Sequence, residues 1–315
     1  MTVVVTGAAG FVGSHLCEAL LEEGIEVRAL DAFTDFYPRS TKEENLAPLH
    51  GRSGFSFVEG DLTAVDLRAL LDGVEVVYHL AGQPGVRPSW GREFGEYVRH
   101  NIAATQRLLE AVKGLPLRKL LYASSSSVYG DAESYPTSES FRPRPVSPYG
   151  VTKLAAEHLC ELYRANFGLP TASLRLFTVY GPRQRPDMAF SRLIGAAVRD
   201  EAFELYGDGE QTRDFTFVGD VVRAMREAAA SEWCGVANIG GGARTSMNQV
   251  LAMVEAVLGP LRVTRGSRAH GDVHHTAADT TVAASAFGYA PRTGLADGLR
   301  AMVAWERGRE RAGVP

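Results

Sequence analysis

Tyr149 and Lys153 stand four residues apart in the segment SPYGVTK. On a helix this spacing places both side chains on one face, one turn apart. Ser147 and Pro148 favour a helix start here, as the capping residue and the first helical residue. A tyrosine with a pKa of about 10 is a weak base, but a neighbouring ammonium favours its phenolate. The pair is therefore suited to removing a hydroxyl proton, although the same spacing also fits an ordinary surface pair.

Four consecutive serines, 124–127, directly follow the segment RKLLYA. Four serines alone are typical of a flexible linker. The preceding apolar run predicts a buried strand instead, so the hydroxyls lie at the end of a core strand. This is a position from which side chains in an α/β fold can reach a ligand.

A glycine-rich turn opens the chain, with Gly7, Gly10 and Gly13 in TGAAGFVG between a predicted strand and a predicted helix. Glycines allow a tight turn and a close approach to a pyrophosphate, and the helix N-terminus offers free N–H groups. The alternative is a tight turn without a ligand. A second predicted strand ends at Asp31, whose carboxylate can bind ribose hydroxyls and repel a 2′-phosphate. These features favour NAD over NADP.

Further polar residues follow the next strands. Arg39 and Lys42 lie close to Asp31 in sequence and leave NADP open as an alternative. Asp61 ends the third strand, where it could accept from an adenine amino group, cap the next helix, or do both. The segment HLAG, 79–82, ends the fourth strand with small residues that let a dinucleotide lie against the backbone.

The elements that position these residues alternate between strands and helices. Strands are predicted at TVVVT, EVRAL, FSFVEG, VEVVYHLA, RKLLYAS and TASLRLF, and helices at FVGSHLCEALLEEG, DLTAVDLRALLDG, REFGEYVRHNIAATQRLLEAVKG and PYGVTKLAAEHLCELYRANFG. This order predicts an α/β fold, a Rossmann-type doubly wound parallel sheet. We expect an NAD-binding domain at 1–176, to which about 213–240 returns, and a smaller substrate-binding lobe formed mainly by 177–315.

Composition excludes several classes of function. The 315 residues carry a net charge of −4, which argues against a nucleic-acid surface. We expect no membrane span, no signal peptide and a cytoplasmic location. Cys17, Cys160 and Cys234 fit neither a disulfide framework nor a metal site, and no metal is expected.

In combination and in order, TGAAGFVG, HLAG, SSSSVYG, YGVTK and RDFTFVGD resemble the extended short-chain dehydrogenase/reductases that modify nucleotide sugars. The resemblance covers nearly the whole chain. It implies a Rossmann domain with a sugar-nucleotide lobe and bound NAD. The cofactor-binding residues it implies are Gly7, Gly10, Phe11, Val12, Gly13, Asp31, Lys42, Asp61, Leu62, Leu80, Ala81, Gly82, Gln83, Asn101, Ser124, Tyr149 and Lys153.

The same resemblance makes Ser125, Tyr149 and Lys153 the catalytic residues. Ser125 falls at the family's Ser/Thr position, where a hydroxyl bridges the tyrosine and the sugar 4-oxygen. Related 4,6-dehydratases carry an Asp-Glu pair at the next two positions, because elimination needs an acid and a base. Here Ser126 and Ser127 stand there, so elimination is disfavoured and 4-epimerisation through a 4-keto sugar remains.

The segment RLFTVYGPRQRPDMAF resembles the UDP-glucuronate 4-epimerase branch. UDP-galactose epimerases tend to have Asn-Pro where this chain has Thr178-Val179. The 4-keto form of a glucuronate is a β-keto acid that can lose CO₂. We expect the hydroxyls of Ser126, Ser127 and Thr178 to hold the carboxylate in an orientation that suppresses this loss. Arg185 and Arg192 are candidates for contacts with the carboxylate or a phosphate, or for solvated surface roles.

The segment ELYGDGEQTRDF resembles the family's uridine and pyrophosphate segment. We expect Tyr206 to lie against the base and Arg213 to bind phosphate. Asp272 is a candidate for the uridine ribose, whereas the spacing RAHGD departs by one residue from the family pattern and leaves Arg268 without an assigned role. Arg87 is placed to reach sugar or phosphate. We expect His274 and His275 to be solvated loop residues rather than metal ligands.

Alternatives to a UDP-glucuronate 4-epimerase are a 4-epimerase of a neutral UDP-hexose (UDP-glucose or UDP-N-acetylglucosamine), a net oxidoreductase that releases NADH, and a non-catalytic NAD-binding protein. The intact Ser125, Tyr149 and Lys153 weigh against the last. In the family, the helices at 91–113 and 148–167 pack against the same pair of a second subunit. We therefore expect a homodimer.

Overall fold

The computed structural model describes residues 1–267, 273–311 and 313, and a seven-stranded parallel sheet forms its centre. The strand order is β11-β6-β5-β4-β1-β2-β3, and each neighbouring pair is parallel. Their bounds are β1 (Thr2–Thr6), β2 (Glu26–Asp31), β3 (Phe55–Glu59), β4 (Val76–His79), β5 (Lys119–Ser125), β6 (Thr171–Leu176) and β11 (Gly235–Ile239).

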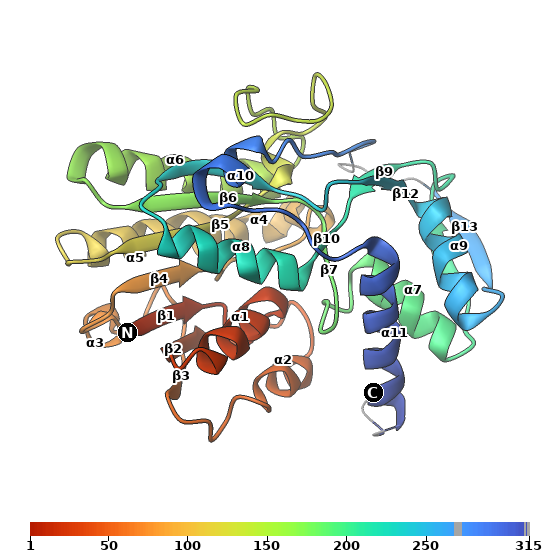
Figure 1. Ribbon diagram of the computed structural model, residues 1–315, viewed down its shortest axis with the longest axis horizontal. Helices are drawn as coiled ribbons and strands as arrows, with labels where there is room; N and C mark the ends of the chain where they lie inside the picture. The colour runs from red at the N-terminus through yellow and green to blue at the C-terminus, as the bar shows by residue number, and fades with distance from the viewer. Residues whose placement is uncertain (268–272, 312, 314–315) are drawn as a thin grey trace.

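Helices cover both faces of this sheet, as expected for a Rossmann-type fold (Figure 1). One apolar cluster joins the sheet to α1 (Phe11–Glu22), α2 (Arg39–Leu46), α8 (Val218–Ala230) and α10 (Thr281–Phe287). A second joins the other face to α3 (Leu67–Leu71), α5 (Ala104–Val112) and α6 (Pro148–Phe167). Because the central strands are apolar on both faces, they stay buried between these layers.

A second lobe lies beside the sheet (Figure 1) and has its own apolar core. Its helices are α7 (Ala189–Val198), α9 (Met247–Leu258) and α11 (Leu295–Arg311). Three strand pairs accompany them: β7 (Val179–Tyr180) with β10 (Thr216–Phe217), β8 (Phe203–Tyr206) with β13 (Val263–Gly266), and β9 (Thr212–Asp214) with β12 (Arg244–Ser246).

Two predicted elements need correction. The helix predicted at 61–73 is only α3, because Asp66 rather than Asp61 accepts the hydrogen bonds of its first turn. The sequence prediction also omits α2, whose segment RSTKEENL has one large apolar residue, Leu46.

The long helix predicted at 92–114 is divided. It consists of a 3₁₀ turn at Gly91–Glu93, α4 (Phe94–Tyr97), a π-helical segment at Val98–Ala103 and α5. A π segment changes the direction in which its side chains point, and such segments often occur at functional sites.

Candidate active site

One large cavity of about 680 Å³ is lined by residues of both the sheet domain and the second lobe. Every predicted cofactor or substrate residue that the structure describes lines it, except Asn101. Asp272 lies outside the described residues, and so does Arg268. The sequence therefore locates residues that the fold brings to a single site.

The glycine-rich turn is built for a close backbone approach. Gly7 has a φ of +72°, and a Cβ at Gly13 would lie 2.2 Å from the Gly7 carbonyl oxygen. Gly10 caps α1 without any side-chain hydrogen bond to the first turn, and Phe11 and Val12 line the cavity. Uncapped N–H groups beside a small-residue turn fit a dinucleotide pyrophosphate.

Asp31 ends β2 and lines the cavity. Its carboxylate accepts hydrogen bonds from the backbone N–H groups of Ala9, at 3.1 Å, and Phe33, at 2.9 Å. Burial raises the pKa of Asp31, and the ammonium of Lys42 at 3.9 Å opposes that rise. These contacts tie the carboxylate to the glycine-rich turn, where it can meet a ribose.

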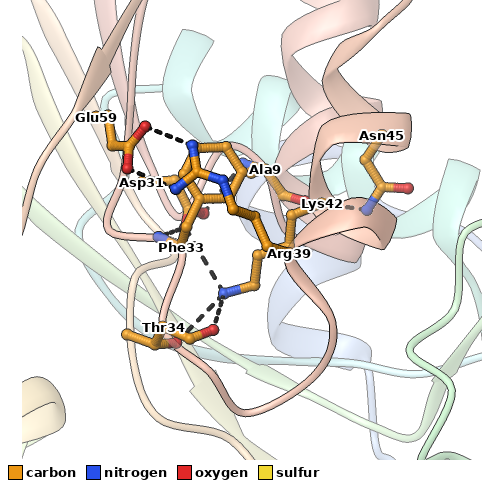
Figure 2. Close-up of polar contacts among 8 residues, drawn as sticks. All are labelled: Ala9, Asp31, Phe33, Thr34, Arg39, Lys42, Asn45 and Glu59. Atoms are coloured by element: carbon orange, nitrogen blue, oxygen red, sulfur yellow. Dashed lines mark hydrogen bonds and ion pairs between the residues drawn. The ribbon is translucent and has the colours of Figure 1, made fainter.

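The two cations beside Asp31 are already engaged by other groups (Figure 2). Arg39 donates to Glu43 and to both oxygens of Glu59, at 2.7 Å each. Lys42 donates to the Thr34 carbonyl oxygen at 2.8 Å. Since carboxylates hold Arg39 away from the cavity lining, the arrangement favours NAD over NADP.

Asp61 lines the cavity together with the next residue, Leu62. Burial favours a higher pKa for Asp61, but hydrogen bonds from the backbone and side chain of Thr63 lower it. Its other carboxylate oxygen accepts from Arg99 at 2.6 Å. The aspartate is thus held as an anion in a turn rather than at a helix N-terminus.

Asn101 does not line the cavity but supports a loop that does. In the π segment it accepts from the Gln83 backbone N–H at 2.7 Å and donates to the Gln83 carbonyl oxygen and to Thr152. A Cβ at Gly82 would lie 2.7 Å from the Asn101 amide oxygen. Asn101 therefore fixes the loop after β4 without lining the cavity itself, and its role in cofactor binding stays a prediction.

The proposed base and its partners meet at the end of β5. Ser147 caps α6 by accepting from the Gly150 N–H, so Tyr149 and Lys153 occupy its first two turns. Burial raises the pKa of Tyr149, whereas hydrogen bonding to the side chain of Ser125 and the charge of Arg185 oppose the rise.

Lys153 lies behind this pair, only 6% exposed. Its ammonium donates to the Ala123 carbonyl oxygen at 2.8 Å and lies 4.9 Å from the centroid of the Tyr122 ring. Burial lowers the pKa of Lys153 from 10.5 to about 8. At neutral pH the ammonium still favours a phenolate one helical turn away.

Hydroxyl groups and one arginine line the neighbouring part of the cavity. Ser126, Ser127 and Thr178 all contribute to its wall. Arg185 also lines it, and two hydrogen bonds of 2.9 Å join its guanidinium to Asp187. Arg185 is therefore not a solvated surface residue.

Aromatic and cationic side chains form the far end. Two arginines lie close to Tyr206, with the guanidinium of Arg87 4.4 Å and that of Arg192 5.1 Å from its ring centroid. Arg213 donates to the carbonyl oxygens of Thr212 and His274. A flat ring flanked by positive charges suits a base and a diphosphate.

The adjacent histidines differ from each other. The His275 ring is hydrogen-bonded to the hydroxyl of Thr212 at 2.8 Å, so it is not the solvated side chain predicted. His274 is exposed, and its backbone N–H donates to Asp131. Within 1–267, 273–311 and 313, no group of three or more His, Cys, Asp or Glu side chains could hold a metal ion.

Several cavity residues are absent from the sequence predictions, among them Phe36, Tyr37, Glu204 and Gln211. Phe36 and Tyr37 come from a loop without a recognisable motif, whereas Glu204 and Gln211 lie in the segment ELYGDGEQTRDF but have no predicted role. Of the helices that the structure describes, none is long and apolar enough to cross a membrane.

Comparisons with known proteins agree with this geometry. Residues 3–240 match the model of the NAD dependent epimerase/dehydratase family. The solved structure of a UDP-glucuronic acid 4-epimerase from Bacillus cereus, in complex with UDP-glucuronic acid and NAD, superposes with a TM-score of 0.95 at 44% identity. The match covers 98% of this chain and 99% of that one.

Two curated relatives are also described as epimerases of UDP-sugars. A Bacillus subtilis (strain 168) protein described as an uncharacterized UDP-glucose epimerase is 43% identical over 97% of this chain and 98% of its own length. A UDP-glucuronate 4-epimerase of Thermodesulfobacterium geofontis (strain OPF15) is 34% identical over 96% of this chain and 95% of its own. The chain belongs to the NAD-dependent epimerase/dehydratase family, in its extended short-chain dehydrogenase/reductase branch.

Proposed function

We propose that this protein is an NAD-dependent 4-epimerase of a UDP-sugar, and that it interconverts UDP-glucuronate and UDP-galacturonate. The observation that carries the proposal is the environment of Tyr149: a phenol that lines the same cavity as Ser125, with hydroxyls where dehydratases carry acids. Inversion at C4 needs one base and a hydride acceptor, whereas elimination needs a further acid and base.

The chain's residues have distinct roles in this reaction. Bound NAD supplies reversible hydride acceptance. Tyr149 removes the proton of the sugar 4-hydroxyl and returns it, with Ser125 bridging the two oxygens. Lys153 keeps a positive charge one turn behind the phenol. The glycine-rich turn and Asp31 hold the dinucleotide.

The hydroxyl-lined wall supports a substrate carboxylate. Ser126, Ser127 and Thr178 offer neutral donors without an acid that would protonate a decarboxylating intermediate. Arg185 offers a cation on the same cavity, while Tyr206 and Arg213 serve the uridine diphosphate. The Bacillus cereus neighbour holds UDP-glucuronic acid, which supports this choice.

A 4-epimerase of a neutral UDP-hexose is the second candidate, supported by the Bacillus subtilis relative. The test is to incubate purified protein separately with UDP-glucuronate, UDP-glucose and UDP-N-acetylglucosamine, and to separate the products by anion-exchange chromatography. We expect inversion of UDP-glucuronate with the highest kcat/KM. Inversion of UDP-glucose alone would overturn the substrate assignment and keep the reaction class.

We infer that the protein is a homodimer. Phe94 and Val98 on α4 and the π segment, and Val151 and Leu162 on α6, expose between 37% and 54% of their surface. The members of each pair are four and eleven residues apart, so each pair shares one helix face. Since α4 and α6 pack side by side, a second copy would cover both faces at once.

Light scattering at micromolar concentration should give a dimer mass, and Leu162→Glu should give a monomer. A wild-type monomer would contradict this inference.

We propose a cytoplasmic location, because buried Cys17 and Cys160, which form no disulfide, suit a reducing compartment. We also propose that residues 1–176 and about 213–240 serve the cofactor, and that 177–315 mainly serve the sugar nucleotide.

A further inference from the structure

A buried polar cluster lies directly behind the end of β5. Ser124, Glu157 and Arg175 are 3%, 2% and 4% exposed, and they come from β5, α6 and β6. The Ser124 hydroxyl lies 2.8 Å from Oε2 of Glu157, and Nε of Arg175 donates to the same oxygen at 3.0 Å. Nη2 of Arg175 donates to Oε1 at 2.5 Å. The roles assigned above to Tyr149 and Lys153 make no use of this carboxylate.

Besides Glu157, Tyr129 also holds the arginine. Its Nη1 donates to the hydroxyl of Tyr129 at 2.7 Å, and its guanidinium lies 4.7 Å from the centroid of that ring. The Tyr129 hydroxyl donates to Asn238 on β11 at 2.7 Å. Arg175 therefore has little freedom to release Glu157, and removing either partner would leave a buried charge unpaired.

The position of Glu157 links this cluster to the reaction. Tyr149, Lys153 and Glu157 follow one another at intervals of four on α6, so they form one column facing β5. Lys153 bonds the Ala123 carbonyl oxygen, and Glu157 bonds the next side chain, Ser124. The helix thus fixes two successive residues of the strand that delivers Ser125.

The hydrogen bond to Glu157 determines whether the Ser124 hydroxyl can donate or accept toward the cavity. A carboxylate paired with a guanidinium can only accept hydrogen bonds, whereas a hydroxyl has one proton and two lone pairs. The Ser124 proton is therefore committed to Glu157, and its oxygen can only accept from a group in the cavity that it lines. An oxygen that can only accept favours a positively charged or hydrogen-bond-donating neighbour over a neutral neighbour that cannot donate.

We propose that Glu157, held by Arg175, is a positioning residue that makes Ser124 an obligate acceptor and thereby favours the positively charged, oxidised nicotinamide over the reduced one. The proposal rests on the proposed use of NAD, with the nicotinamide at the Tyr149 end of the cavity. An epimerase benefits because its cofactor returns to the oxidised form after each turnover.

The experiment is a competition for cofactor that needs no sugar. The full-length chain is incubated with equimolar NAD⁺ and NADH and freed of unbound cofactor, and the released cofactor is measured by chromatography after denaturation. Glu157→Gln should shift the bound NAD⁺:NADH ratio toward NADH by roughly tenfold, as expected when a hydrogen bond loses its charged partner. Ser124→Ala should shift it in the same direction.

The double variant shows whether Glu157 acts through Ser124. Glu157→Gln should change the ratio no further when Ser124 is already alanine. Asp220→Asn is the matched control, because Asp220 is also buried and paired with an arginine, Arg223 at 2.6 Å, but does not line the cavity. It should lower the melting temperature and leave the ratio unchanged.

An unchanged ratio in folded Glu157→Gln, or an equal shift with and without Ser124, would overturn the proposal. If Glu157→Gln does not fold, an unchanged ratio in Ser124→Ala refutes it instead. Failure of the proposed epimerase function would look different: UDP-sugars would stay uninverted while the cofactor ratios still shifted as described.

Discussion

Replacing Lys153 by methionine should reveal how much stability the buried ammonium costs. The lowered pKa means that the unfolded chain holds this proton more tightly than the folded chain. Below pH 8 both forms are protonated and the folded state bears the full cost of the buried charge. Between pH 8 and 10.5 the folded lysine loses its proton first, so the wild-type protein gains stability as the pH rises.

The magnitude follows from the change in pKa from 10.5 to about 8. At about 1.4 kcal/mol per pH unit this corresponds to roughly 3 kcal/mol. The free energy of unfolding of Lys153→Met minus that of wild type should fall by roughly this amount between pH 7 and pH 10.5. Lys153→Met also lacks the hydrogen bond to Ala123. This loss contributes equally at every pH, so it changes the size of the difference in unfolding free energy but not its slope against pH.

Urea unfolding of cofactor-free protein at pH 7, 8, 9 and 10 measures this difference. Lys113→Met is the control, because Lys113 pairs with Glu110 on the surface and its pKa is raised rather than lowered. The free energy of unfolding of Lys113→Met minus that of wild type should not fall over this pH range. If the free energy of unfolding of Lys153→Met minus that of wild type did not change with pH, this would refute the conclusion that the fold keeps a costly charge beside Tyr149.

Three further outcomes are expected. Tyr149→Phe should fold and keep bound NAD but lose at least a hundredfold in kcat, because it removes only the hydroxyl that transfers the proton; turnover at the wild-type rate, measured by product chromatography, would exclude Tyr149 as the base. Ser127→Ala and Thr178→Ala should each slow inversion of UDP-glucuronate by roughly tenfold to a hundredfold and release CO₂, detected as a UDP-pentose by mass spectrometry; wild-type rates and products in both would exclude the proposed carboxylate contacts. Gly13→Ala should lose NAD binding in calorimetry, because its Cβ would lie 2.2 Å from the Gly7 carbonyl oxygen; retained affinity would mean that the turn relaxes.

The sequence predicts the sheet and most of the cavity because each motif joins a chemical group to a local element. Gly7 and Gly13 need a strand before and a helix after them, and Tyr149 follows a capped helix start. Such constraints lie within a few residues of one another. Alternating apolar strands and helices then define the parallel sheet that brings the motifs together.

The features that the sequence does not predict depend on contacts between distant segments. The pairing of Glu157 with Arg175 requires β6 to lie beside β5 under α6, and nothing in the sequence indicates that these two residues meet. The π segment that turns Asn101 toward Gln83 reads as regular helix in sequence. Asp66 and Asp61 are equally good helix caps by residue type, and only their backbone geometry distinguishes them.

The most direct test of the proposed reaction is proton NMR of purified protein with UDP-glucuronate in D₂O. We predict that UDP-galacturonate appears until both sugars reach equilibrium, that C4 of each keeps its original hydrogen, and that no stoichiometric NADH absorbance develops. Retention of that hydrogen reports hydride removal and return within one site. Deuterium at C4, or steady accumulation of NADH without an inverted product, would contradict the account.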